Sequence, residues 1–230
     1  MTEELGLLQQ AHWQSVYGAN PRMYGDEASA PASRAAERFS ADGVRSILEL
    51  GSGHGRDSLH FARRGFHVHA ADFSSAGLDQ LSARARQESA TDRIDPMLHD
   101  VRAPIPLADE SADAAFAHML LCMALSTKQI HDLVDEIRRV LRPGGRLVYT
   151  VRHTGDAHYG TGDPHGDGIY EHGGFAVHYF DRALVDSLAR GWDVDGVHPF
   201  EEGALPRKLW RVDQVKRRAG HAASAELDER

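Results

Sequence analysis

The chain has 230 residues, of which 41% are hydrophobic and 26% charged, with a formal net charge of −8. This balance is typical of one globular domain with a substantial core, and the negative charge argues against a nucleic-acid backbone as the main partner. The single cysteine, Cys122, excludes an internal disulfide and a cysteine-rich zinc site, and it favours a cytoplasmic location. No apolar stretch approaches the roughly 20 residues that span a bilayer, so we expect no membrane partner.

The first 42 residues are expected to form a helical cap on the domain that follows. Trp13, Tyr17 and Tyr24 lie there among glycine, asparagine and proline, and one helix is predicted from about residue 30 to 39. Residues 43–217 are predicted to form the main domain, and residues 218–230 a flexible tail.

From Val44 onward, short apolar segments alternate with amphipathic ones. Helices are predicted over 56–64, after Ser74, over 128–141 and near 181–190. The helix over 128–141 is the clearest, because its apolar residues recur at helical spacing and Arg142-Pro-Gly-Gly145 ends it. Strands are predicted over 44–50, 66–73, 94–100, 113–121, 146–151, 192–201 and 208–216. Strands that alternate with helices predict an α/β fold with a mostly parallel sheet.

Glycines at positions 51, 53 and 55 directly follow the first predicted strand and open a helix. Because glycine has no side chain, we expect the backbone N–H groups of this loop to approach a ligand at the start of that helix. Asp72 ends the next predicted strand, where its carboxylate can accept hydrogen bonds from the hydroxyls of a ribose. Both features occur in domains that bind NAD and in domains that bind S-adenosylmethionine (SAM).

The form of the glycine loop separates these two cofactors. Dinucleotide sites usually carry Gly-x-Gly-x-x-Gly, whereas this loop is Gly-x-Gly-x-Gly with Glu49 two places before it. It resembles motif I of class I SAM-dependent methyltransferases. Three later segments also resemble that family: His99-Asp100-Val101 at the adenine amino group, residues 113–124 under the methionine part, and the turn over 141–147. The resemblance covers about residues 44–152.

The resemblance implies a Rossmann-like three-layer sandwich whose seven-stranded, mostly parallel sheet has the order 3-2-1-4-5-7-6, with the last strand antiparallel. Residues 118–125, 151–160 and 201–210 further resemble bacterial small-molecule methyltransferases, broadly similar to thiopurine and tellurite-resistance methyltransferases. The cofactor implied is SAM, with S-adenosylhomocysteine as product. The partner implied is a small molecule that receives the methyl group on O, N or S by in-line displacement.

Residues from all these motifs are expected at the cofactor. The expected cofactor contacts are Trp13, Tyr24, Glu49, Gly51, Ser52, Gly53, Gly55, Arg56, Asp72, Phe73, Asp100, Val101, Ala117 and His118. The expected substrate contacts are Met119, Cys122, Met123, His158, Tyr159 and Arg207.

Candidate catalytic residues follow from where ligands bind in such sheets, beyond the carboxyl ends of the strands. That rule selects His118 after the fourth strand, and Arg152 and His153 after the fifth. His153 is the leading candidate for a general base, because imidazole titrates near neutral pH. The alternative is that His153 only orders its loop. Arg152 is expected either to orient an anionic substrate or to pair with an internal carboxylate.

Five histidines fall between residues 153 and 178, in a stretch rich in glycine. They lack the cysteine pair or the His-Glu-x-x-His pattern of a zinc site, so no metal is expected. The stretch is predicted to be a lid loop that closes over the substrate.

Three other functions remain open. A SAM-binding cyclase or lyase would share the cofactor motifs without transferring a methyl group. An NAD-dependent oxidoreductase would share the glycine loop and the acidic residue. A non-catalytic interaction module is disfavoured by the intact glycine loop and Asp72. No feature of the sequence indicates an oligomeric state.

Overall fold

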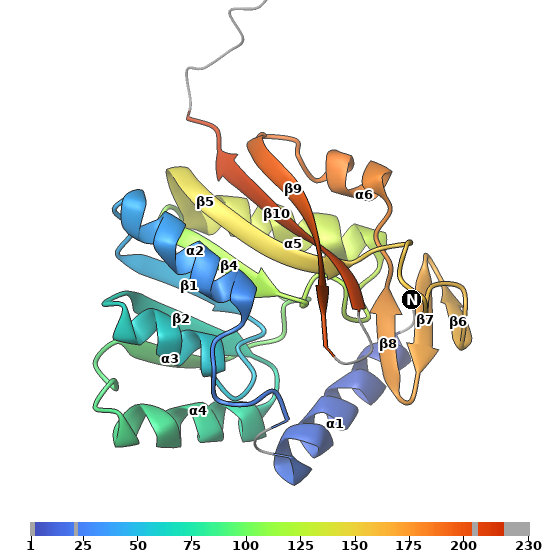
Figure 1. Ribbon diagram of the computed structural model, residues 1–230, viewed down its shortest axis with the longest axis horizontal. Helices are drawn as coiled ribbons and strands as arrows, with labels where there is room; N and C mark the ends of the chain where they lie inside the picture. The colour runs from blue at the N-terminus through green and yellow to red at the C-terminus, as the bar shows by residue number, and fades with distance from the viewer. Residues whose placement is uncertain (1–2, 21–22, 204–206, 219–230) are drawn as a thin grey trace, which may run out of the picture.

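The computed structural model describes residues 3–20, 23–203 and 207–218, and a seven-stranded sheet lies at its centre (Figure 1). The strand order is β3-β2-β1-β4-β5-β10-β9. The strands are β1 (Ser46–Leu50), β2 (His67–Asp72), β3 (Ile94–Leu98), β4 (Ala112–His118), β5 (Leu141–Arg152), β9 (Trp192–Glu202) and β10 (Arg207–Lys216). Only β10 runs antiparallel to its neighbours β5 and β9 among these strands of the described chain. The predicted fold, order and antiparallel last strand are confirmed, with β9 and β10 as strands six and seven.

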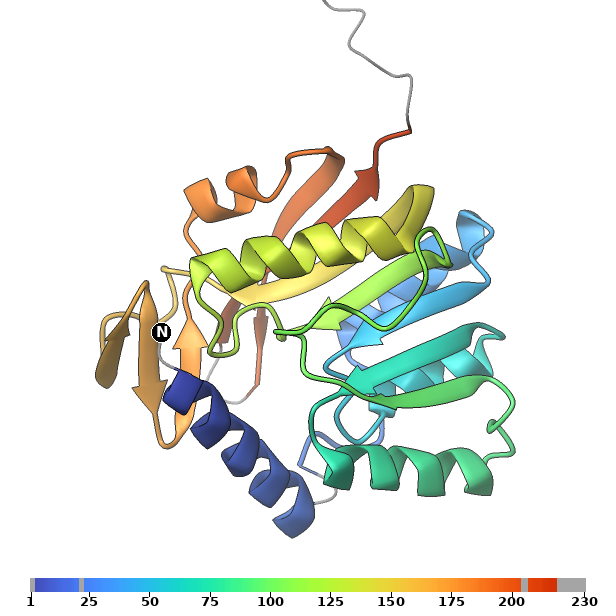
Figure 2. The same cartoon turned by 180° about the vertical axis from the view of Figure 1, so that it is seen from behind.

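Helices cover both faces of the sheet (Figures 1 and 2). Buried residues of α2 (Ala30–Ala41), α3 (Arg56–Arg63) and α4 (Ser75–Gln87) pack in one cluster with one face of the sheet. Those of α5 (Thr127–Val140) and α6 (Arg182–Ser187) pack against the other face. These five helices lie where the sequence predicts helices.

Side-chain caps account for several helix starts. The side chains of Ser29, Ser74 and Ser126 each accept a hydrogen bond from a backbone N–H in the first turn of the helix that follows. Ser126 and Gln129 complete a capping box at α5.

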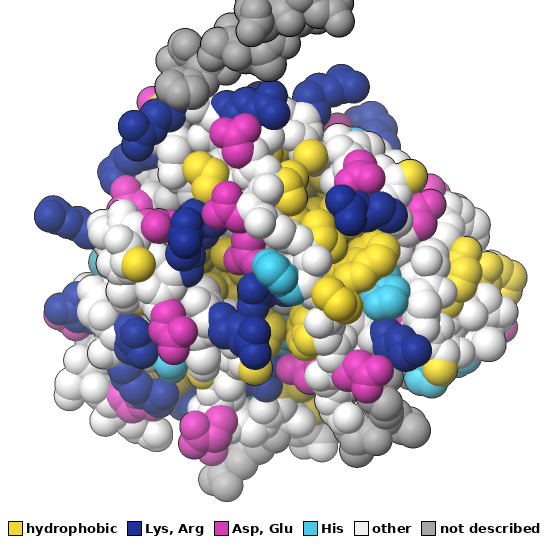
Figure 3. All heavy atoms as spheres, turned by 45° about the horizontal axis from the view of Figure 1, so that its top comes forward, with side chains coloured by type: hydrophobic (Ala, Val, Ile, Leu, Met, Phe, Trp, Pro, Cys, Tyr) yellow, Lys and Arg dark blue, Asp and Glu magenta, His cyan; other side chains and the backbone are white. Residues whose placement is uncertain are grey.

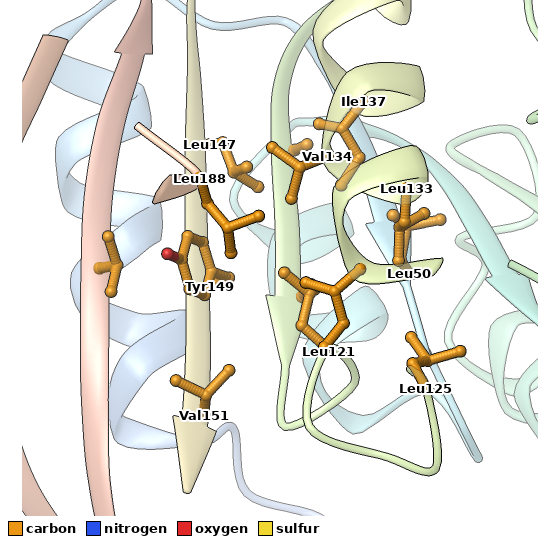
Figure 4. Packing of buried hydrophobic residues seen from close by; sticks show 14 of the residues in the cluster. Leu50, Leu121, Leu125, Leu133, Val134, Ile137, Leu147, Tyr149, Val151 and Leu188 are labelled. Atoms are coloured by element: carbon orange, nitrogen blue, oxygen red, sulfur yellow. The ribbon is translucent and has the colours of Figure 1, made fainter. Parts of the chain in front are cut away.

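The core between α5 and the sheet is built from large aliphatic and aromatic side chains (Figure 4). Leu133, Val134 and Ile137 of α5 point toward the sheet, where Leu147 and Tyr149 of β5 lie fully buried. The predicted apolar stripe of the helix over 128–141 therefore faces the core.

Two parts of the described chain go beyond the sequence prediction. Helix α1 (Glu3–Ala19) lies in the predicted helical cap, but its bounds were not predicted, because its apolar residues form no clear stripe and Leu7 and Leu8 are more than half exposed. The predicted lid loop contains an antiparallel sheet of β6 (Asp163–Gly166), β7 (Ile169–His172) and β8 (Phe175–His178). Gly173 and Gly174 both have positive φ, as a two-residue hairpin turn requires. The predicted tail lies outside the described residues beyond Arg218.

Basic and acidic side chains are intermingled over the face of the molecule shown in Figure 3. The described residues on that face therefore form no continuous basic surface of the kind that binds a phosphate backbone. Of the helices in the described ranges, none combines the length and apolarity needed to cross a membrane.

Candidate functional site

A pocket of about 410 Å³ opens at the carboxyl ends of β1, β2 and β4. This is within the range of about 300–1,000 Å³ that small-molecule sites occupy. A smaller pocket of about 60 Å³ adjoins it, and Gly51, Asp72 and Phe73 line both pockets. Open parallel sheets bind their ligands at this edge.

The glycine loop forms the floor of the pocket, and it does so differently from our expectation. The N–H groups of Gly51 and Ser52 both donate to the carbonyl oxygen of Ala71, and that of Gly53 donates to Asp72. These three N–H groups hold the loop against the end of β2 and are not directed at a ligand. Gly51 and Gly53 have positive φ, and a Cβ on Gly53 would lie 2.4 Å from the hydroxyl of Tyr17. Glycine is therefore required here by backbone conformation and close packing.

Asp72 lies between the glycine loop and the start of α4. Its Oδ2 accepts from the N–H of Gly53 and its Oδ1 from the N–H of Ser74, both at 2.8 Å. The residue is only 7% exposed, yet it lines both pockets. Burial raises the pKa of Asp72 to about 6, against the lowering effect of the backbone hydrogen bonds. A ligand in either pocket therefore meets a carboxylate that titrates close to neutral pH.

Glu49 is buried beside a second carboxylate, Asp57. Burial raises the pKa of Glu49 well above its usual range, and the charge of Asp57 acts in the same direction. The Ser58 hydroxyl donates to Glu49 at 2.5 Å. Asp57 accepts from the backbone N–H and the hydroxyl of Ser29, which joins the start of α2 to α3. Both carboxylates line the larger pocket.

His118 ends β4 inside the larger pocket and faces a carboxylate from the end of β9. Its Nε2 lies 3.4 Å from Oε2 of Glu202, and its Nδ1 lies 2.8 Å from the hydroxyl of Thr150. The hydrogen bond with His118 is the main cause that lowers the pKa of Glu202, and the charges of Arg56 and Arg207 add to it. The pocket therefore has one strongly polar wall.

Aromatic side chains from α1 and the segment after it cover the pocket. Trp13 stacks on Tyr17 with ring centroids 5.6 Å apart, and Tyr24 lies 6.5 Å from Trp13. Gln9 anchors the same helix to the small sheet, since its side chain donates to the carbonyl of Gly174 at 2.8 Å. Thus α1, and not the predicted lid segment, covers this pocket.

Most of the residues expected from the sequence line the larger pocket. These are Trp13, Tyr24, Glu49, Gly51, Ser52, Gly53, Arg56, Asp72, Phe73, His118, Met119, Met123 and Arg207.

Asp100 and Val101 line the smaller pocket instead. Although burial opposes it, the pKa of Asp100 is lowered by hydrogen bonds from Arg102. Gly55 and Ala117 line neither pocket: Gly55 caps the start of α3, and Ala117 is fully buried in the core.

The two catalytic candidates at the end of β5, Arg152 and His153, lie away from both pockets. Arg152 is buried and pairs with Asp156 at 2.5 Å. This contact matches the second of its two expected roles, which was to pair with an internal carboxylate. His153 stacks on Trp210 with ring centroids 4.5 Å apart, and its Nδ1 accepts from the N–H of Gly155. Burial lowers the pKa of His153. The geometry gives no support to His153 as a general base.

Three expected substrate contacts also lie outside both pockets. Cys122 is fully buried, and burial raises the pKa of its thiol to about 11. His158 lies 3.2 Å from Arg152, and Tyr159 packs with Tyr170 in the small sheet. No residue of the predicted lid, 153–178, lines either pocket, since the hairpins fold outward beside α1 (Figure 1).

The larger pocket is also lined by residues that were not among the expected contacts, although most of them lie in segments that the sequence assigned to the site. They are Tyr17, Met23, His54, Asp57, Leu120, Glu202 and Gly203. A signal existed for Glu202: strand six of the predicted order runs parallel to the first five, so its carboxyl end reaches the same edge of the sheet. His54 and Asp57 lie in the glycine-loop motif, and Leu120 lies in the segment expected under the methionine part.

Comparison with known proteins finds a match over the middle of the chain, which contributes part of the pocket lining. Residues 47–145 match the family model described as a methyltransferase domain. The chain is 35% identical over 102 residues to a demethylmenaquinone methyltransferase from Clavibacter sepedonicus. That match covers 44% of this chain and 39% of the relative, so the chain spans about two fifths of the relative's length.

Solved structures resemble nearly the whole chain. One is the 1,6-didemethyltoxoflavin-N1-methyltransferase of Burkholderia thailandensis with bound 1,6-didemethyltoxoflavin and S-adenosylhomocysteine. Its alignment with this protein has a TM-score of 0.74 at 17% identity, and the alignment covers 95% of this chain and 91% of the chain in that structure. A second is the [4+2]-cyclase SpnF, with a TM-score of 0.71 at 19% identity over 91% of this chain and 95% of the SpnF chain. At these identities the likeness shows the shared fold.

Proposed function

We propose that this chain is a class I SAM-dependent methyltransferase that methylates a small molecule, and the match of residues 47–145 to the methyltransferase domain model supports this proposal. The methyl group moves from SAM to an O, N or S atom of the acceptor. One observation carries this proposal: a single pocket joins the glycine loop and Asp72 to a polar wall made by His118, Glu202 and Arg207. The first group suits the donor, and the second suits a polar acceptor.

The residues present fit SAM on grounds internal to the structure. The Ser52 hydroxyl is buried in the pocket without a hydrogen-bond partner among the described residues. Asp72 presents a carboxylate to the same space, where ribose hydroxyls can donate to it. Asp100 and Val101 line the adjoining small pocket and are our assignment for the adenine. When bound, SAM supplies a methyl group already activated on a sulfonium.

The polar wall determines the proton chemistry available to the acceptor. An ionised Glu202 only accepts hydrogen bonds, so Nε2 of His118 carries the hydrogen between them. With that hydrogen on Nε2 of a neutral ring, Nδ1 of His118 accepts from the hydroxyl of Thr150, which itself accepts from the N–H of Met119. A neutral imidazole in this tautomer has no free lone pair. His118 therefore holds Glu202 in place, and Glu202 is the group that can accept a proton.

We assign Glu202 as the acceptor of the substrate's proton. The acceptor atom forms its bond to the methyl carbon as the carbon–sulfur bond breaks, and the electron pair of that bond stays on sulfur. The proton that leaves the acceptor atom passes to the carboxylate of Glu202. This role replaces the one predicted for His153. A positioned base contributes about 10²–10⁴-fold where the acceptor carries a proton, and the lowered pKa of Glu202 places its effect toward the lower end of that range.

Two guanidinium groups beside Glu202 favour an acceptor with an anionic or hydrogen-bond-accepting group. Arg56 lies 3.9 Å from Glu202 and donates to the carbonyl of Tyr24, and Arg207 lines the same wall. Arginine suits planar anions because its donors form a rigid fork.

We place the reaction in the cytoplasm, in keeping with the single cysteine of the chain.

Calorimetry and product analysis test the proposal. SAM and NAD are titrated in parallel, and tight binding of NAD without binding of SAM would overturn the cofactor assignment. Acceptor panels of phenols, thiols, amines and carboxylates are then assayed for S-adenosylhomocysteine release. Methylthioadenosine as the sole product would point instead to a cyclase or lyase. Glu202→Gln tests the base, with the exposed neighbour Glu201→Gln as its matched control.

A further inference from the structure

Two histidines and an aspartate meet on the sheet away from the pocket. His67 and His69 are two residues apart on β2, so their side chains point to the same face. Asp95 of β3 pairs directly with His69 in the parallel register. On the opposite face of the same strands, Val68, Ala70 and Ile94 are buried against the helices.

No helix in the described chain covers the part of this face that lies over β2 and β3 (Figure 2) and carries these three side chains. The connection between β3 and β4, residues 99–111, contains no helix, although a crossover between parallel strands usually supplies one. In Figure 2, α5 lies in front of β4 and β5, whereas the ribbons of β2 and β3 have no helix in front of them. The two histidines are partly exposed and Asp95 is 54% exposed, so an ion in solution can reach them.

The donor atoms converge as metal ligands do. Nε2 of His67 lies 3.5 Å and Nδ1 of His69 lies 3.3 Å from the same oxygen, Oδ2 of Asp95. These separations are long for an N–H···O hydrogen bond and are similar to the 3.4 Å between His118 and Glu202. They match the roughly 3.3 Å between ligand atoms of a tetrahedral zinc ion, given metal–ligand bonds of about 2.0–2.1 Å. All three donor atoms lie within 4.8 Å of one another.

From this geometry we propose that His67, His69 and Asp95 bind a Zn²⁺ ion that links the edge strand β3 to β2. Two imidazoles and one carboxylate provide three of the four ligands that Zn²⁺ prefers, and water completes the tetrahedron. His69 is three residues from Asp72 along β2, about 10 Å at the rise of a strand. The zinc site is thus separate from the pocket. Its role is to hold β3, which among the described strands pairs with β2 alone.

Titration of tag-free, metal-stripped protein with zinc chloride tests the site. We expect one equivalent whose affinity falls at least tenfold in His69→Gln and in Asp95→Asn, because loss of even an outer-shell partner costs about 10–100-fold. His198→Gln is the matched control, because His198 faces a single carboxylate, Asp213, at 3.7 Å. Its titration should equal that of the unaltered chain.

A stability measurement and a direct localisation complete the test. Saturation with zinc should raise Tm by about 5–10 °C at a hundredfold excess over Kd, and His69→Gln should lose that rise. Anomalous scattering at the zinc edge should place the ion between the three side chains. Absence of zinc binding, equal affinity in His69→Gln, or an ion found only at other histidines would each overturn the proposal.

Discussion

The carboxylate of Asp72 should govern both the strength of SAM binding and its dependence on pH. We consider Asp72→Asn, which keeps the size of the side chain but removes its charge. Ribose hydroxyls that donate to an ionised acceptor contribute about 1.5–3 kcal/mol. At 1.4 kcal/mol for each factor of ten, Kd for SAM should rise by about 10–100-fold.

The pH dependence follows from the raised pKa of Asp72, about 6 in the ligand-free chain. Only the ionised carboxylate accepts from both hydroxyls, so bound SAM favours the ionised form and lowers this pKa. SAM affinity should therefore be constant above about pH 7 and fall as the pH drops through 6, by up to about tenfold per unit for one proton. The effect on folding has the opposite sign. Because the pKa of Asp72 is higher in the folded chain than in the unfolded chain, the free energy of unfolding falls as the pH rises from about 4 to 6.

Calorimetry with SAM between pH 5 and 8 measures both effects. Asp72→Asn should bind weakly at every pH and lose the step near pH 6. Asp79→Asn, an exposed aspartate on α4, is the control and should keep both the affinity and the step. An unchanged Kd in Asp72→Asn, or a step near pH 6 that persists in that variant, would refute the assignment of Asp72 to the cofactor.

Three further substitutions separate the polar wall of the pocket from the residues after β5. Glu202→Gln should reduce kcat about 10²–10⁴-fold for an acceptor that loses a proton, with the calorimetric Kd for SAM nearly unchanged; full turnover would remove Glu202 from the chemistry. His153→Ala should leave turnover intact and lower the free energy of unfolding by about 0.5–1.5 kcal/mol through the lost stacking on Trp210. A large fall in turnover with unchanged stability would restore His153 as the base. Arg152→Met should destabilise the fold by about 3–5 kcal/mol in denaturant titrations, because it leaves Asp156 buried without its partner; a loss below 1 kcal/mol would contradict that account.

The donor side of the pocket could be predicted because its parts are close in sequence and repeat a parallel unit. The glycine loop follows β1 and Asp72 ends β2, and adjacent parallel strands bring their carboxyl ends to one edge. The amphipathic period of α5 likewise predicted which face of that helix packs on the sheet.

The tertiary structure decided which later residues reach the pocket. Arg152 and His153 follow a strand end, as the rule for such sheets requires, but contacts with Asp156 and Trp210 hold them elsewhere. Glu202 reaches His118 from 84 positions further along the chain, through the pairing of β9 with β10 and of β10 with β5. Side-chain contacts of this kind depend on packing between distant segments, whereas strand and helix periods depend on neighbours a few residues away. Local periodicity therefore predicted the helices and strands, the glycine motif and Asp72 predicted the donor half of the site, and the family resemblance implied the strand order. Long-range packing determined the cover of the pocket, its polar wall and the meeting of His69 with Asp95.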